Sequence, residues 1–192
     1  MDRRQTLKAL GALAATSAAG TSLLADFFRA SAAIRDGRAA WAPVLLSAEQ
    51  AALLPELVDV IIPRTDTPGA KDALVHVFVD LYVKDCYPAP QRAMFLDGFA
   101  ALEAAARSQY GRAFAALTGA ERLALLTRLE RESLQKGEPP ERSFVRSLKS
   151  ATLLGYFSSK PGATQAAEYV HAPGPFRGCV PIKPGQKVSA LQ

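Results

Sequence analysis

The sequence is poor in the residue types that enzymes most often use for catalysis and metal binding. Its 192 residues include only two histidines and two cysteines. The histidines, His76 and His171, are far apart, and no clustered acids complete a recognised set of metal ligands. The patterns GxSxG, GxGxxG and GxxxxGK[ST] are also lacking. These absences predict that the chain has no catalytic residues, no metal and no cofactor of its own.

The two cysteines, Cys86 and Cys179, lack the CxxC or CxxCH spacing of a zinc site or a covalent haem site. Three states remain open for them. They form one internal disulfide, worth roughly 4 kcal/mol in the chain-entropy model, or one of them bridges to a partner chain, or both are buried thiols.

Basic segments with interleaved aromatic residues are lacking as well, which argues against nucleic-acid binding. The net charge of +5 is unevenly distributed. Residues 33–141 carry 12 Lys/Arg and 15 Asp/Glu, whereas residues 142–192 carry seven Lys/Arg and one acid. The basic C-terminal part therefore favours contact with an acidic partner surface.

β-Branched residues are sparse after Val83, while alanine and leucine dominate, which favours helices over strands. The apolar spacing predicts an all-α fold, a small bundle of about five helices. The expected helices are residues 48–62, about 71–86, 90–110, 119–134 and 143–155.

Two of these helix starts have the spacing of a capping box: Ser47 with Gln50, and Thr118 with Glu121. The first helix is expected to end at Pro63, where a polar turn with two prolines follows. Asp66 or Thr67 in that turn is expected to cap the second helix.

Residues 156–192 are rich in proline and glycine and predict an extended, loop-rich tail. Such a segment is expensive to order by itself. We therefore expect the chain to divide into residues 1–32, a helical domain at 33–155 and a tail at 156–192 that wraps a partner subunit.

The first thirty or so residues have the order of an export signal. Arg3 and Arg4, followed by Leu7 and Lys8, precede a weakly apolar stretch and then small residues near Ala32. The paired arginines resemble the twin-arginine signal, which bacteria use as a receptor-read address for export of folded proteins.

A membrane-spanning helix is the weaker interpretation of this segment. The apolar stretch 9–25 has 17 residues, fewer than the roughly 20 that a span needs. Whether the signal is cleaved or stays as a weak anchor remains open.

Several stretches together resemble the gluconate 2-dehydrogenase subunit 3 family, and the resemblance covers about residues 45–182. The most specific stretch is Ile-Pro-Arg-Thr-Asp-Thr-Pro-Gly at 62–69. The others are 78–81, the spaced Phe95, Phe99 and Leu102, 148–159, Tyr169, 173–175 and 178–181.

The resemblance implies a division of labour between subunits. In this family the large subunit is a flavoprotein of the glucose–methanol–choline type, which carries FAD and oxidises fructose, glucose or gluconate. A multihaem cytochrome in the membrane often takes the electrons. The small subunit is not catalytic; it carries the twin-arginine signal and takes the flavoprotein with it to the periplasm, where the complex is membrane-associated.

For the partner interface, the resemblance implies aromatic and tail residues: Tyr156, Phe157, Tyr169, Pro173, Phe176, Arg177 and Val180. Cys179 is the candidate for a bridge, either to Cys86 or to the flavoprotein. The alternative interpretation is a free-standing periplasmic binding module, with a pocket among the aromatic residues Trp41, Tyr82, Tyr110 and Tyr156.

Overall fold

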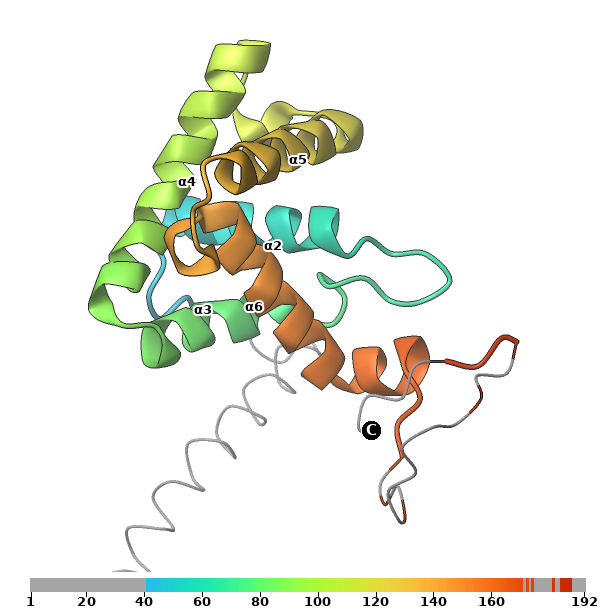
Figure 1. Ribbon diagram of the computed structural model, residues 1–192. Coiled ribbons are helices and arrows are strands. Elements are labelled where there is room, and N and C mark those ends of the chain that lie inside the picture. Colours follow the sequence, from blue (N-terminus) through green and yellow to red (C-terminus); the bar gives the residue numbers. More distant parts are fainter. Residues whose placement is uncertain (1–40, 171, 173, 175–180, 182–183, 188–192) are drawn as a thin grey trace, which may run out of the picture. The chain divides into compact units, whose positions relative to one another are not determined.

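The computed structural model describes residues 41–170, 172, 174, 181 and 184–187 (Figure 1). By its internal contacts the chain divides into two units, Met1–Ala42 and Pro43–Gln192. All of the helices described below belong to the second unit.

Within residues 41–170 the chain forms five α-helices and no strand, which confirms the predicted all-α fold. The helices are α2 (Ala48–Ile61), α3 (Val75–Cys86), α4 (Ala89–Tyr110), α5 (Gly119–Gln135) and α6 (Phe144–Ser158). Three short turns accompany them: η1 (Phe114–Ala116), η2 (Pro140–Arg142) and the π-helical η3 (Gly162–Ala166). Of the helices so described, none is both long enough and apolar enough to span a bilayer.

Both predicted capping boxes are confirmed. At α2, the Ser47 hydroxyl accepts a hydrogen bond from the Gln50 backbone N–H at 3.3 Å, and the Gln50 side chain accepts one from the Ser47 N–H at 3.0 Å. Thr118 and Glu121 make the same reciprocal pair at the start of α5. Such pairs satisfy backbone N–H groups that the first helical turn leaves without partners.

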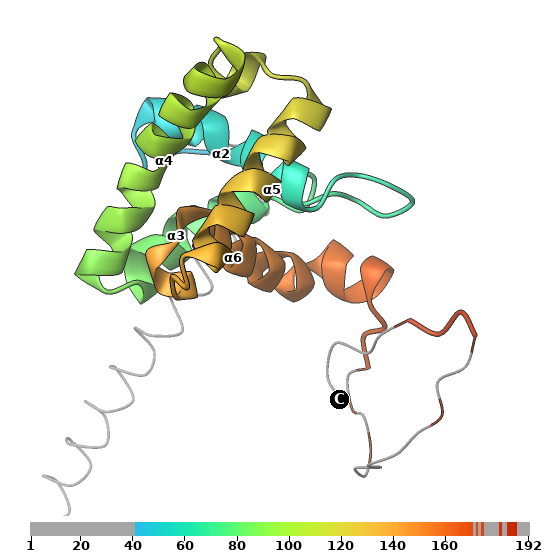
Figure 2. The same ribbon diagram turned by 45° about the horizontal axis from the view of Figure 1, so that its top comes forward.

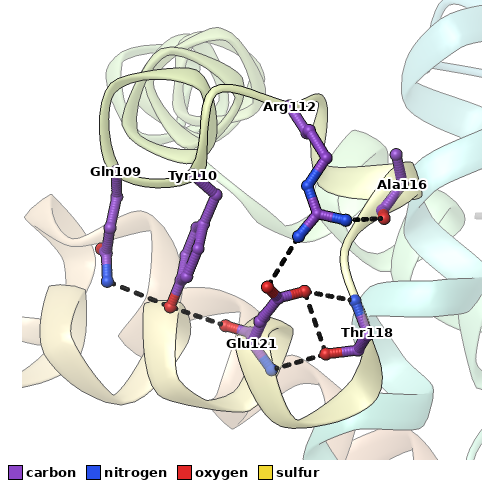
Figure 3. Close-up of polar contacts among 6 residues, drawn as sticks. All are labelled: Gln109, Tyr110, Arg112, Ala116, Thr118 and Glu121. Atoms are coloured by element: carbon purple, nitrogen blue, oxygen red, sulfur yellow. Dashed lines mark hydrogen bonds and ion pairs between the residues drawn. The ribbon is translucent and has the colours of Figure 1, made fainter.

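Figure 3 shows how the corner between α4 and α5 is fixed. The Glu121 carboxylate accepts hydrogen bonds from the Thr118 N–H at 2.8 Å and from Arg112 at 2.7 Å. The Thr118 backbone N–H is the main reason that the pKa of Glu121 lies below its usual value. The Tyr110 hydroxyl, at the end of α4, lies between the Gln109 amide and the Glu121 carbonyl. The two helices are therefore joined by several polar contacts at one point.

Helix α3 begins at Val75, later than predicted, and the predicted caps are wrong. Neither Asp66 nor Thr67 caps it; the residue before the helix is Leu74, which has a left-handed backbone (φ 56°) and makes no side-chain cap. Residues 70–74 instead form a turn in which the Val75 N–H donates to the Ala70 carbonyl at 3.0 Å.

Helix α6 continues to Ser158, so the predicted end at Gly155 is wrong and falls inside the helix. The structure gives this glycine a packing role. A Cβ at Gly155 would lie 2.5 Å from Phe78 of α3. The missing side chain lets α6 approach α3 closely.

Helix α6 is the central element of the bundle, since it contacts α2, α3, α4 and α5 (Figures 1 and 2). Each of the five helices supplies fully buried apolar side chains to the core, among them Leu54, Val79, Phe95, Leu125 and Leu148. Burying one such side chain contributes about 2 kcal/mol. The core thus holds α6 against the four other helices, and the rest of its surface faces solvent.

Candidate functional site

The described residues contain no group of three or more His, Cys, Asp or Glu side chains placed to hold a metal ion. Several of their charged side chains connect elements instead. Glu56 of α2 accepts from Lys71 at 2.5 Å and from Arg122 of α5 at 2.7 Å, and the hydrogen bond from Lys71 is the main cause of its lowered pKa. The Arg122 guanidinium also lies over the Phe114 ring, 5.4 Å from its centroid.

His76 lies on the buried side of α3, with 7% of its surface exposed. Burial, helped by the positive charge of Lys71, lowers its pKa from 6.5 to about 4. The imidazole is therefore neutral at pH 7 and belongs to the core. The second histidine, His171, lies outside the described residues.

Asp80, also on α3, is a buried carboxylate that the sequence analysis missed. It is 1% exposed and accepts three backbone hydrogen bonds, from Val44 at 2.7 Å, Leu45 at 3.1 Å and Leu46 at 3.3 Å. The sequence did contain a signal for it, an acidic residue within the otherwise apolar pattern of α3. Through these bonds α3 holds the segment that leads into α2.

The loop between α2 and α3 contains the most distinctive stretch of the sequence, and side chains close it. Asp72 accepts from Arg64 Nε at 2.8 Å and from the Gly69 N–H at 2.9 Å, and Arg64 lowers the pKa of this carboxyl. The Tyr156 hydroxyl of α6 donates to the Pro68 carbonyl at 2.7 Å. The loop is thereby joined to the central helix.

Gly69 offers a test of this loop. A Cβ there would lie 2.7 Å from the Arg64 backbone N and 3.1 Å from the Ile62 carbonyl oxygen, and backbone atoms cannot move aside cheaply. We expect Gly69→Ala to reduce the free energy of unfolding by about 2 kcal/mol, measured by urea denaturation. Gly119→Ala is the control, because a Cβ at Gly119 meets nothing within 4 Å. Equal stability of the two variants would contradict the tight closure.

A cleft of about 580 Å³ lies between α4, the end of α5 and the start of α6. Met94, Leu102 and Phe144 contribute apolar surface, and the Ser133 hydroxyl is buried there without a hydrogen-bond partner. Its lining carries charges of both signs, from Asp97, Glu132, Glu138, Lys136 and Arg142. The cleft therefore does not select a ligand of one charge.

The aromatic residues of the alternative binding pocket serve other contacts. Tyr82 stacks on Phe78 with ring centroids 5.4 Å apart, and Tyr110 belongs to the α4–α5 corner. Tyr156 is 2% exposed. None of these tyrosines lines the cleft, and Trp41 belongs to the first unit.

Exposed large apolar side chains concentrate at the end of α6 and just beyond it. Leu153, Leu154 and Phe157 are 39%, 46% and 46% exposed, and Tyr169 is 50% exposed. We call the first three the α6 strip. The strip is a second feature that the sequence pattern did not single out, because apolar spacing places both leucines in a helix without showing which of its faces is exposed.

The predicted interface residues have different positions. Phe157 and Tyr169 are exposed, as an interface residue must be. The prediction for Tyr156 needs correction, because its ring packs inside this chain and its hydroxyl is bonded to Pro68. The others, Pro173, Phe176, Arg177 and Val180, lie outside the described residues.

Cys86 is exposed at the end of α3, which excludes the state in which both thiols are buried. Its predicted partner Cys179 lies outside the described residues, so the pairing stays a prediction. The predicted export-signal residues also lie outside them: Arg3, Arg4, Leu7 and Lys8.

A family model described as Gluconate 2-dehydrogenase subunit 3 matches residues 48–174. This range begins at α2 and includes the closed loop, Asp80 and the α6 strip. No curated protein and no solved structure matches the chain.

Proposed function

Because this chain belongs to the gluconate 2-dehydrogenase subunit 3 family, we propose that it is the non-catalytic small subunit of an FAD-dependent sugar dehydrogenase. The substrate class is fructose, glucose or gluconate. FAD is carried by a flavoprotein partner of the glucose–methanol–choline type, and haem by a membrane-bound cytochrome subunit. The small subunit stabilises the flavoprotein and escorts it during export.

The family match carries this proposal, and the α6 strip supports it. The strip and Tyr169 account for four of the seven exposed large apolar side chains among the described residues. Concentrated apolar exposure is typical of a surface that another protein covers. The polar side chains described above are used mainly to join helices, which suits a binding role.

The export part of the proposal rests on the order of residues at the N-terminus. Arg3 and Arg4, a weakly apolar stretch and small residues suit a twin-arginine signal. The flavoprotein is then exported attached to this chain. The complex works in the periplasm and is associated with the membrane through the cytochrome.

The test replaces Arg3→Lys and Arg4→Lys together in cells that produce the flavoprotein. We expect periplasmic dehydrogenase activity to fall to background while the flavoprotein accumulates in the cytoplasm. The matched control is Arg35→Lys with Arg38→Lys, the same change beyond the predicted signal. Normal periplasmic activity in the first variant would contradict the escort role.

A free-standing periplasmic binding module is the second candidate, and the cleft of about 580 Å³ favours it. It predicts a chain that is soluble and monomeric by itself and binds a small ligand. The small-subunit proposal predicts poor solubility without the flavoprotein, because the α6 strip stays exposed. Solubility of the chain produced alone separates the two.

A further inference from the structure

The α6 strip forms one continuous surface. Leu153 and Phe157 are four positions apart on α6 and lie one above the other on the helix, and Leu154 is adjacent. All three are between 39% and 46% exposed. The three large apolar side chains occupy neighbouring positions, so one partner surface can bury them together.

The strip is held in place without any partner. Its neighbour Tyr156 is buried, is bonded through its hydroxyl to the Pro68 carbonyl, and packs edge-on against Phe157 with ring centroids 5.3 Å apart. On the same turn Gly155 brings α6 against Phe78. A surface that is already ordered loses little conformational entropy on binding.

Basic residues precede and follow the strip in the sequence. Lys160 is exposed three positions after Phe157, and Lys149 lies one turn before Leu153, where it pairs with Glu130 at 2.8 Å. Residues 142–192 include seven basic residues and a single acid, Glu168. Charge complementarity therefore favours a partner surface that is apolar at its centre and acidic at its rim.

The exposed leucines of α5 form no such surface. Leu123 and Leu134 are 55% and 56% exposed, so each is as accessible as the residues of the strip. They are eleven positions apart, about three helical turns, and so do not touch each other. Isolated exposed leucines are ordinary on a protein surface, which makes this pair a matched control.

We propose that the α6 strip, with Lys160 beside it, is the docking surface for an acidic-rimmed apolar face of the catalytic subunit. This inference rests on the proposed function and adds the surface and the chemistry of its partner. An anionic membrane is the weaker occupant. Helices that lie in a membrane interface present an apolar face along most of their length, whereas the strip covers little more than one turn.

The test measures affinity between the full-length chain and the purified catalytic subunit by titration calorimetry. Leu154→Ser with Phe157→Ser is expected to weaken binding by about 100-fold, because two central anchors are lost. Leu123→Ser with Leu134→Ser is expected to change it by less than about threefold. Thermal unfolding of both double variants establishes that each remains folded.

Lys160→Glu tests the charge component. We expect it to weaken binding by about tenfold at low salt, and the difference from wild type to shrink at about 1 M salt, where charges are strongly screened. An effect of the same size at both salt concentrations would contradict the proposal that the partner surface has an acidic rim.

The outcomes separate the inference from the proposed function. If the wild-type chain does not bind the catalytic subunit, the proposed function fails. If it binds and the strip variant binds equally well, or the two double variants lose affinity equally, the strip is not the docking surface while the function stands. If the wild-type chain self-associates and the strip variant does not, the occupant is a second copy of this chain. Strip-dependent sedimentation with phosphatidylglycerol vesicles would identify a membrane. Either result overturns the proposal.

Discussion

Asp80→Ala is expected to lower the free energy of unfolding by about 3 kcal/mol. The variant loses three hydrogen bonds to a charged acceptor, which contribute about 1.5 to 3 kcal/mol each and are not additive. Water can reach part of the freed backbone, which limits the loss. Urea denaturation measures the change, and hydrogen exchange should become faster at the amides of Val44, Leu45 and Leu46.

Asp85→Ala is the control for this experiment, because Asp85 is an exposed acid on the same helix and its loss changes the net charge equally. It should change stability by less than about 0.5 kcal/mol. If both variants lose the same stability, or if exchange at residues 44–46 is unchanged in Asp80→Ala, the carboxylate does not hold the segment before α2.

Acid is expected to destabilise the helical domain through His76. Its pKa is about 4 in the folded chain, whereas a solvated imidazole has its ordinary pKa of 6.5, so the unfolded chain binds the proton more readily. The stabilisation is complete above pH 6.5 and is lost as the pH falls toward 4. One pKa unit corresponds to about 1.4 kcal/mol, so the loss amounts to about 3 kcal/mol.

The control for this prediction is His76→Gln, which removes the titrating group, and the quantity compared is the slope of stability against pH. Glu56, Asp72 and Glu121 also have lowered pKa values, but carboxyls contribute mainly below about pH 4.5. Between pH 6.5 and 4.5 the variant should therefore be nearly flat where the wild type declines. Parallel slopes would contradict a buried, neutral His76.

Sequence patterns predicted the fold correctly where the interacting residues are close together in the sequence. Capping boxes at Ser47 and Thr118 involve residues three positions apart, so the sequence displays both partners. The errors arose from tertiary contacts. Gly155 looked like a helix end but accommodates Phe78, and the start of α3 depends on the turn that ends at Leu74.

The candidate site was predicted less completely, for a related reason. Apolar spacing placed Leu153 and Leu154 in a helix but did not show that they face solvent, which depends on how α6 packs against four other helices. Tyr156 was predicted for the interface, and its hydroxyl bond to the Pro68 carbonyl, 88 positions away in the sequence, was not visible in the pattern. Among the predicted interface residues that the structure describes, Phe157 and Tyr169 are exposed and Tyr156 is buried.

The most direct test of the small-subunit proposal is the molar mass of this chain mixed with the catalytic subunit, measured by light scattering during size-exclusion chromatography. The account predicts one species with the summed mass of both chains. It also predicts that the isolated catalytic subunit carries all of the FAD absorbance. Two separate peaks, each with the mass of a free chain, would contradict the account.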